Sequence, residues 1–118
     1  MPGRNAFPHQ ARLTTKRDFD AVFRDGRKVA DRAFVCYVAR REGRQCRLGV
    51  AVSRRVGRAV VRNRIKRCIR EYFRTHAPEF VAAHDVVVVV RPEAAPYRYA
   101  QCADALDRLL RRGGLVRG

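Results

Sequence analysis

The sequence predicts a single α+β domain in which helices pack on one face of a small mixed sheet. The chain has 118 residues, of which 47% are hydrophobic, and this is enough for one compact core. Segments with helical and β-type apolar spacing follow one another in the order helix, strand, strand, helix, strand, helix. Each of these segments has an apolar stripe that must be buried, and layering the helices on the sheet buries them all.

The first predicted helix covers residues 16–24. Residues 1–12 before it are largely polar and include two prolines, so they predict a flexible N-terminal arm. Thr14 or Thr15 can cap the helix, and Gly26 suits the left-handed position that often ends one. The packed domain is therefore expected to begin at residue 13.

Two strands are predicted next. In residues 28–40 the side chains divide between two faces, with Phe34, Cys36 and Val38 on one and Val35, Tyr37 and Ala39 on the other. Glu42 and Gly43 favour a turn, and residues 46–54 return as a second strand. A hairpin of these two strands is the simplest arrangement.

The second half of the chain predicts a helix, a strand and a helix. Residues 59–75 form a helix whose apolar arc consists of Val61, Ile65, Cys68, Ile69 and Tyr72. Residues 86–90 are consecutive valines, which predict a strand covered on both faces. Residues 97–112 form the last helix, which the two following glycines end. Residues 113–118 are then a flexible tail, so the domain is expected to span residues 13–112.

The charge of the chain limits the classes of function. Lysine and arginine number 27 against 11 aspartate and glutamate residues, which gives a formal net charge of +16. Such self-repulsion points to a polyanionic partner or to an acidic membrane surface. The longest apolar run, residues 86–90, is far too short to cross a bilayer, and the N-terminus lacks a signal-peptide core. We therefore expect a soluble, cytoplasmic protein.

The cysteines do not predict a metal site. Cys36, Cys46, Cys68 and Cys102 form no C-x-x-C pair and have no histidine at the spacing of a zinc motif. We expect them to be small core residues.

Half of the net charge lies in one segment. Residues 54–74 hold nine basic side chains against Glu71 alone, a net charge of +8. On the predicted helix, Asn63, Lys66, Arg67, Arg70 and Arg74 lie opposite the apolar arc, with Arg62 and Arg64 on the flanks. A solvated helix face requires charge but not charge of one sign, and like charges four residues apart destabilise a helix unless an anion offsets them. A phosphate backbone is the natural anion, so the segment predicts binding to a nucleic acid.

Aromatic side chains suggest a second binding surface. Phe19 and Phe23 lie four residues apart on the first predicted helix, and Tyr37 lies on the first strand. Together they could stack on unpaired bases, although packing in the core is the alternative for each. Tyr37 is the better candidate, because it lies on the face opposite Phe34 and Cys36.

No catalytic side chain is predicted. His9, His76 and His84 are scattered near the ends of elements, and no carboxylate pair or activated nucleophile stands out. The sequence is typical of a binding protein.

At this point a family becomes recognisable. Residues 47–57, RLGVAVSRRVG, and residues 59–67, AVVRNRIKR, resemble the signature of the bacterial ribonuclease P protein component. The resemblance extends from about residue 12 to residue 112.

The resemblance implies a non-catalytic subunit of a ribonucleoprotein that cleaves the 5′ leader from precursor transfer RNA. The RNA subunit would perform the hydrolysis with magnesium, and no metal is expected on the protein, which would be a monomer in a 1:1 complex. Phe19, Phe23 and Tyr37 would line a cleft for the leader. The residues implied to contact the RNA subunit are Arg54, Arg55, Arg62, Asn63, Arg64, Lys66, Arg67 and Arg70.

The resemblance also implies an α/β sandwich with a left-handed β-α-β crossover, like a domain of a small-subunit ribosomal protein. General topology rules would favour the right-handed crossover. Arg58 stands where asparagine often caps the second helix in the family. This change is expected to weaken the cap by about 0.5–2 kcal/mol and leaves the start of the helix open.

Two other functions remain as alternatives. A basic scaffold or ribosome-associated protein would bind folded RNA by charge alone, and Asn63 would then have no special role. An autonomous nuclease would need a catalytic constellation that the sequence does not contain.

Overall fold

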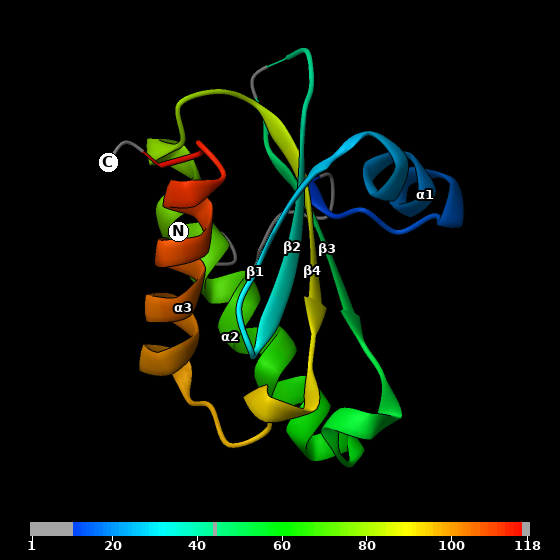
Figure 1. Cartoon of the computed structure of the whole chain (residues 1–118), viewed down its shortest axis with the longest axis vertical. Coiled ribbons are helices and arrows are strands. Elements are labelled where there is room, and N and C mark those ends of the chain that lie inside the picture. The colour runs from blue at the N-terminus through cyan, green and yellow to red at the C-terminus, as the bar shows by residue number, and fades with distance from the viewer. Residues whose placement is uncertain (1–10, 44, 117–118) are drawn as a thin grey trace, which may run out of the picture.

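The computed structural model describes residues 11–43 and 45–116, and within them three α-helices and four strands form one α+β domain (Figure 1). The elements are α1 (Lys16–Asp25), β1 (Arg27–Ala30), β2 (Phe34–Arg40), β3 (Arg47–Val52), α2 (Ala59–His76), β4 (His84–Val90) and α3 (Tyr99–Arg112). The fold class and the three helices are as the sequence predicts. In this described part of the chain, no helix combines the length and the apolar character that a membrane span requires.

The sheet has the strand order β1-β2-β4-β3, so the predicted hairpin of residues 28–40 with residues 46–54 is wrong. Strand β4 lies between them, antiparallel to β2 and parallel to β3. The reason is that β4 is apolar on both faces. Such a strand is best buried at the centre of a sheet, where it has a neighbour on each edge.

The predicted strand of residues 28–40 is two strands joined by a tight turn. The Oδ1 atom of Asp31 accepts hydrogen bonds from the backbone N–H groups of Ala33 and Phe34, both at 2.9 Å. This aspartate turn reverses the chain, so that β1 pairs antiparallel with β2. The sequence pattern did not reveal this turn, because the residues before and after it both have the alternation of a strand.

Helices cover both faces of the sheet rather than one. Helices α2 and α3 lie on one side in Figure 1, and α1 lies on the other. On the α2 and α3 side, Val86, Val88 and Val90 are buried in the main core. On the α1 side, Val87 packs with Leu13 and Val22. The prediction that residues 86–90 are covered on both faces is therefore confirmed.

The packed domain extends beyond both predicted limits. Ala11 is buried, and Arg12 forms a β-bridge with Leu48 on the free edge of β3, so these two residues of the predicted arm belong to the packed domain. At the other end Leu115 is buried, and its carbonyl accepts a hydrogen bond of 2.9 Å from the N–H group of Val81. The rest of the predicted arm and tail, residues 1–10 and 117–118, lies outside the described residues.

Gly26 ends α1, but not in the left-handed conformation that the sequence suggested. Its φ and ψ angles are −81° and 151°, which any residue can adopt. The glycine is needed for space instead, because a Cβ atom there would lie 2.5 Å from the carbonyl oxygen of Val22. The N–H group of Gly26 donates to that same oxygen at 2.7 Å, so the close approach is part of the helix end.

Gly26→Ala is expected to lower the free energy of unfolding by about 1–3 kcal/mol, because backbone atoms must move to accept the methyl group. Urea denaturation of the purified protein measures this change. Gly113→Ala is the matched control, since Gly113 has a φ of −79° and its Cβ would meet nothing closer than 3.5 Å. Equal stabilities for the two variants would contradict the steric argument.

Candidate nucleic-acid interface

Helix α2 is amphipathic, with one apolar side and one polar side. Ile65, Ile69 and Tyr72 of the predicted arc are buried, while Val61 and Cys68 are half-buried against the core. Phe73 is buried as well, which the predicted arc did not include. The helix begins at Ala59, and the side chain of its N-cap residue, Arg58, makes no capping hydrogen bond. The start that the sequence left open is thus at Ala59, with the weakened cap that was expected.

The polar side of α2 carries most of the predicted RNA-binding residues. Asn63 and Arg67 are exposed there, and Lys66 and Arg70 are half-buried beside them. Arg54 and Arg55 are exposed in the short 3-10 turn before the helix. Within the described residues, no carboxylate pairs with any of these cations, although Arg74 farther along is paired with Glu71. We call Arg54, Arg55, Asn63, Lys66, Arg67 and Arg70 the cationic face.

Two of the predicted contact residues are bound to the protein's own backbone. The Nη1 atom of Arg62 donates to the carbonyl of Gly57 at 2.9 Å, which ties the start of α2 to the preceding turn. The Nη2 atom of Arg64 donates to the carbonyl of Ala95 at 2.5 Å, and its Nε atom is buried with no partner in the described structure. Arg64 therefore points toward the segment before α3 and holds it to α2.

Arg12 extends the cationic face to the edge of the sheet. It lies on the segment that bridges to β3, close enough to Arg70 for its charge to affect that side chain. Burial, and then the charge of Arg12, lower the pKa of Arg70. A bound anion near Arg70 would offset both effects. The sequence pattern did not indicate Arg12, because it lies in a short segment without periodicity.

The three predicted aromatic residues meet on the opposite side of the sheet. Phe23 and Tyr37 have ring centroids 4.9 Å apart in an edge-to-face arrangement, and Phe19 and Phe23 are 6.3 Å apart. Phe23 is 40% exposed, whereas Phe19 and Tyr37 are half-buried against Val87 and Val89. We call Phe19, Phe23 and Tyr37 the aromatic cluster. Phe19 and Tyr37 are thus partly packed in the core, while the ring of Phe23 is exposed, and contact with unpaired bases stays a prediction.

Gly49 leaves the space that the ring of Phe19 occupies. A Cβ atom at Gly49 would lie 2.6 Å from the Cζ atom of Phe19, so the ring rests directly on the backbone of β3. The glycine is the third residue of the RLGVAV run that the resemblance singled out. Its function is therefore to hold the aromatic cluster close to the sheet.

An ion pair fixes the same face of the sheet. The Nε and Nη2 atoms of Arg47 donate to the two carboxylate oxygens of Asp85 at 2.8 Å each, which joins β3 to β4. Arg41 lies 3.4 Å from the same carboxylate, and Arg47 lies 3.9 Å from Asp18 of α1. The hydrogen bonds to Asp85 raise the pKa of Arg47. The bidentate pair joins the two strands and holds Arg47 in place, and Arg47 in turn lies within ion-pair distance of Asp18 on α1, the helix that carries Phe19 and Phe23.

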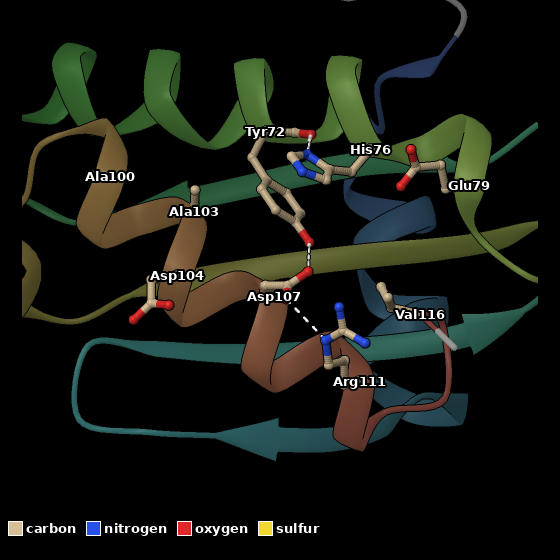
Figure 2. A pocket seen from close by; sticks show the side chains of 9 residues that line it. All are labelled: Tyr72, His76, Glu79, Ala100, Ala103, Asp104, Asp107, Arg111 and Val116. Carbon is tan, nitrogen blue, oxygen red and sulfur yellow. Dashed lines mark hydrogen bonds and ion pairs between the residues drawn. The ribbon is translucent and has the colours of Figure 1, made fainter. Parts of the chain in front are cut away.

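A hollow of about 480 Å³ lies between α2 and α3, and no residue of the cationic face lines it (Figure 2). Within it the hydroxyl of Tyr72 donates to Asp107 at 3.2 Å, and the Nε atom of Arg111 donates to that carboxylate at 3.0 Å. The ring of His76 stacks on Tyr72, and its Nδ1 atom lies 2.9 Å from the Tyr72 carbonyl. Burial and the neighbouring Asp107 raise the pKa of Tyr72. These polar groups bind one another and hold the two helices together.

Among the described residues, no group of three or more histidine, cysteine, aspartate or glutamate side chains could hold a metal ion. The cationic face offers guanidinium and ammonium groups, which repel a metal ion. The amide oxygen of Asn63 is the single possible ligand among its named side chains. The named side chains of the cationic face therefore do not offer a set of oxygen ligands for magnesium.

Comparison with known proteins gives one consistent family. The model of the family described as Ribonuclease P matches residues 7–114. The ribonuclease P protein component of Staphylococcus epidermidis is 38% identical over 101 residues, which cover 85% of this chain and 87% of that protein. The corresponding protein of Desulfovibrio desulfuricans is 41% identical over 113 residues, with 92% and 87% covered.

Solved structures agree with these relatives. The RNase P protein of Staphylococcus aureus superposes with a TM-score of 0.84 and 34% identity, over 91% of this chain and 98% of that one. The RNase P protein of Thermotoga maritima gives a TM-score of 0.77 and 30% identity, over 86% and 96%.

Arg64→Ala is expected to lower the free energy of unfolding by about 1–3 kcal/mol, because the Ala95 carbonyl loses its donor. Arg67→Ala is the matched control. Arg67 is exposed, so its removal should change stability by no more than about 0.5 kcal/mol. Urea denaturation of both variants makes the comparison. If the Arg64 variant were as stable as the Arg67 variant, the anchoring role of Arg64 would be wrong.

Proposed function

Because the chain belongs to the family of ribonuclease P protein components, we propose that its cationic face binds the catalytic RNA while its aromatic cluster binds the 5′ leader of precursor transfer RNA. The family is the protein subunit of ribonuclease P, which matures the 5′ end of transfer RNA. The protein is an accessory subunit of that holoenzyme, and the RNase P RNA is its partner.

The charge distribution supports binding of the RNA subunit by the cationic face. Carboxylates neutralise some of the arginines, as Glu71 does for Arg74 and Asp85 for Arg47. The cations around Asn63 have no such partner in the described structure, and the charge of Arg12 adds to burial in lowering the pKa of Arg70. A phosphate backbone would relieve this repulsion.

One observation carries the proposal for the leader: Phe19, Phe23 and Tyr37 meet on the face of the sheet opposite α2. Single-stranded RNA is bound by stacking of bases on exposed aromatic rings, and Phe23 offers such a ring. Since the sheet separates this cluster from the cationic face, one molecule could hold both RNAs without competition.

Magnesium enters the proposal through the RNA. A cationic face repels metal ions, but it lowers the repulsion between two polyanions and thereby assists the metal ions that the RNA binds. We further propose a monomer in a 1:1 complex, acting in the cytoplasm.

Tyr37→Ala should weaken binding of precursor transfer RNA by about 1–3 kcal/mol, because one stacking ring is lost. Binding of mature transfer RNA, which lacks the leader, should be unchanged. The measurement is the dissociation constant of each RNA from the complex reconstituted with RNase P RNA. Tyr99→Ala is a suitable control, since Tyr99 is 38% exposed but lies on α3 on the other side of the sheet. Equal losses for precursor and mature RNA would refute leader binding.

Asn63→Ala and Arg67→Ala separate specific RNA binding from binding by charge alone. Arg67→Ala should weaken binding of RNase P RNA and lower its salt slope by roughly one unit or slightly less. Asn63→Ala should weaken binding without changing the slope, because the amide carries hydrogen bonds but no charge. Titrations at several salt concentrations show both effects. If the Asn63 variant binds like the wild type, the basic-scaffold alternative is favoured.

A further inference from the structure

The edge strand β1 places a lysine beside the aromatic cluster. In the antiparallel register of β1 with β2, Lys28 lies directly opposite Tyr37. Residues directly opposite each other in such a pair project from the same face of the sheet, with their Cβ atoms about 5 Å apart. Tyr37 packs on the α1 side, where its ring centroid lies 4.9 Å from that of Phe23. Lys28 therefore projects from the face that carries the aromatic cluster.

The neighbours of Lys28 on β1 support this orientation. Val29 lies opposite Cys36 and packs against the main core on the α2 and α3 side. Arg27 lies opposite Val38, which is buried in that same core. Since side chains alternate along a strand, Arg27 and Val29 share one face and Lys28 takes the other. Two adjacent cations thus lie on opposite faces of one edge strand.

The charge of Lys28 is available to a ligand. Its side chain is exposed, and the helix on its side of the sheet, α1, carries three carboxylates that each have another cation as a partner. These pairs are Asp20 with Lys16 at 2.6 Å, Asp25 with Arg24 at 3.1 Å and Asp18 with Arg47 at 3.9 Å. Within residues 11–43 and 45–116, no carboxylate forms an ion pair with Lys28.

The aromatic cluster needs such a cation. Single-stranded RNA is bound by aromatic rings that stack on its bases together with cations that follow its phosphates. The cationic face does not supply these cations to the leader, because α2 lies across the sheet from the aromatic cluster. Lys28 supplies one from the edge strand, and its flexible four-carbon stem lets the ammonium group reach a phosphate near the rings.

We propose that Lys28 binds a backbone phosphate of the 5′ leader, next to the base that stacks on Phe23 and Tyr37. This inference rests on the proposed function and adds a residue that the sequence pattern did not indicate. An ammonium group recognises the charge of a phosphate and not the identity of a base, so the contact strengthens leader binding without a sequence preference. It also gives leader binding a salt dependence.

Lys28→Gln is expected to weaken binding of precursor transfer RNA about three- to tenfold at low salt, because one phosphate contact is lost. The salt slope of precursor binding should fall by about 0.7, the value for one contact to a single strand. Binding of mature transfer RNA should be unchanged. The measurements are dissociation constants from the complex reconstituted with RNase P RNA, at several salt concentrations.

Arg27→Gln is the matched control, since it removes the same charge from the adjacent residue on the other face of β1. This variant should bind precursor like the wild type, and Lys28→Arg should retain both the affinity and the salt slope. Melting curves first show that the variants fold. Equal losses for Lys28→Gln and Arg27→Gln would overturn the proposal, as would wild-type binding by Lys28→Gln.

Precursors with a single uncharged methylphosphonate linkage in the leader locate the contact. At one linkage the substitution should weaken binding to the wild-type complex but should weaken binding to the Lys28→Gln complex no further. Losses that add to the effect of Lys28→Gln at every linkage would contradict a direct contact.

Tyr37→Ala separates this inference from the proposed function. If Tyr37→Ala weakens precursor binding and Lys28→Gln does not, the phosphate contact is wrong while leader binding by the aromatic cluster stands. If Tyr37→Ala leaves precursor binding unchanged, leader binding by the aromatic cluster is itself wrong, and the inference about Lys28 fails with it.

Discussion

The burial of β4 on both faces is the constraint on which the rest of the structure depends. Its valines cannot face water on either side, so the strand must lie at the centre of the sheet and be covered twice. Helices α2 and α3 cover one face, and α1 covers part of the other. This arrangement creates two separate surfaces, a cationic one on α2 and an aromatic one between α1 and the sheet. The separation that the proposed function needs therefore follows from core packing.

The arginines of this chain have two different functions. Arg47 and Arg64 hold the fold together, the first through Asp85 and the second through the Ala95 carbonyl. Others are neutralised by carboxylates near them, such as Arg108 by Asp104. The net charge of +16 therefore includes arginines that stabilise the fold as well as cations that are free to bind RNA. Cations without a carboxylate partner also lie elsewhere in the described structure, such as Arg27 and Arg91, but residues 54–70 hold eight basic side chains and no carboxylate, and that local density matters more for RNA binding than the total.

The sequence predicted those features that depend on local periodicity. The approximate extent of α2, most of its buried arc and the central valines follow from apolar spacing, while charge and aromatic spacing indicated the two candidate surfaces and the family resemblance gave them expected roles. The pairing of β2 with β4 could not be predicted in this way, because strand partners are chosen by long-range burial. The hydrogen bond of Arg64 could not be predicted for a related reason, because the Ala95 carbonyl that it binds comes from a distant segment.

Strand β3, whose sequence is RLGVAV, contacts the elements that carry both surfaces. Arg47 anchors the strand to β4 and lies near Asp18 of α1, while Gly49 makes room for Phe19. On its free edge, Leu48 bridges to the segment that carries Arg12, next to Arg70. The strand then leads through Ser53, which caps the short turn before α2. A change in the twist or position of β3 would therefore move the aromatic cluster and the cationic face together. The two binding surfaces are distinct in chemistry, but they share one rigid support.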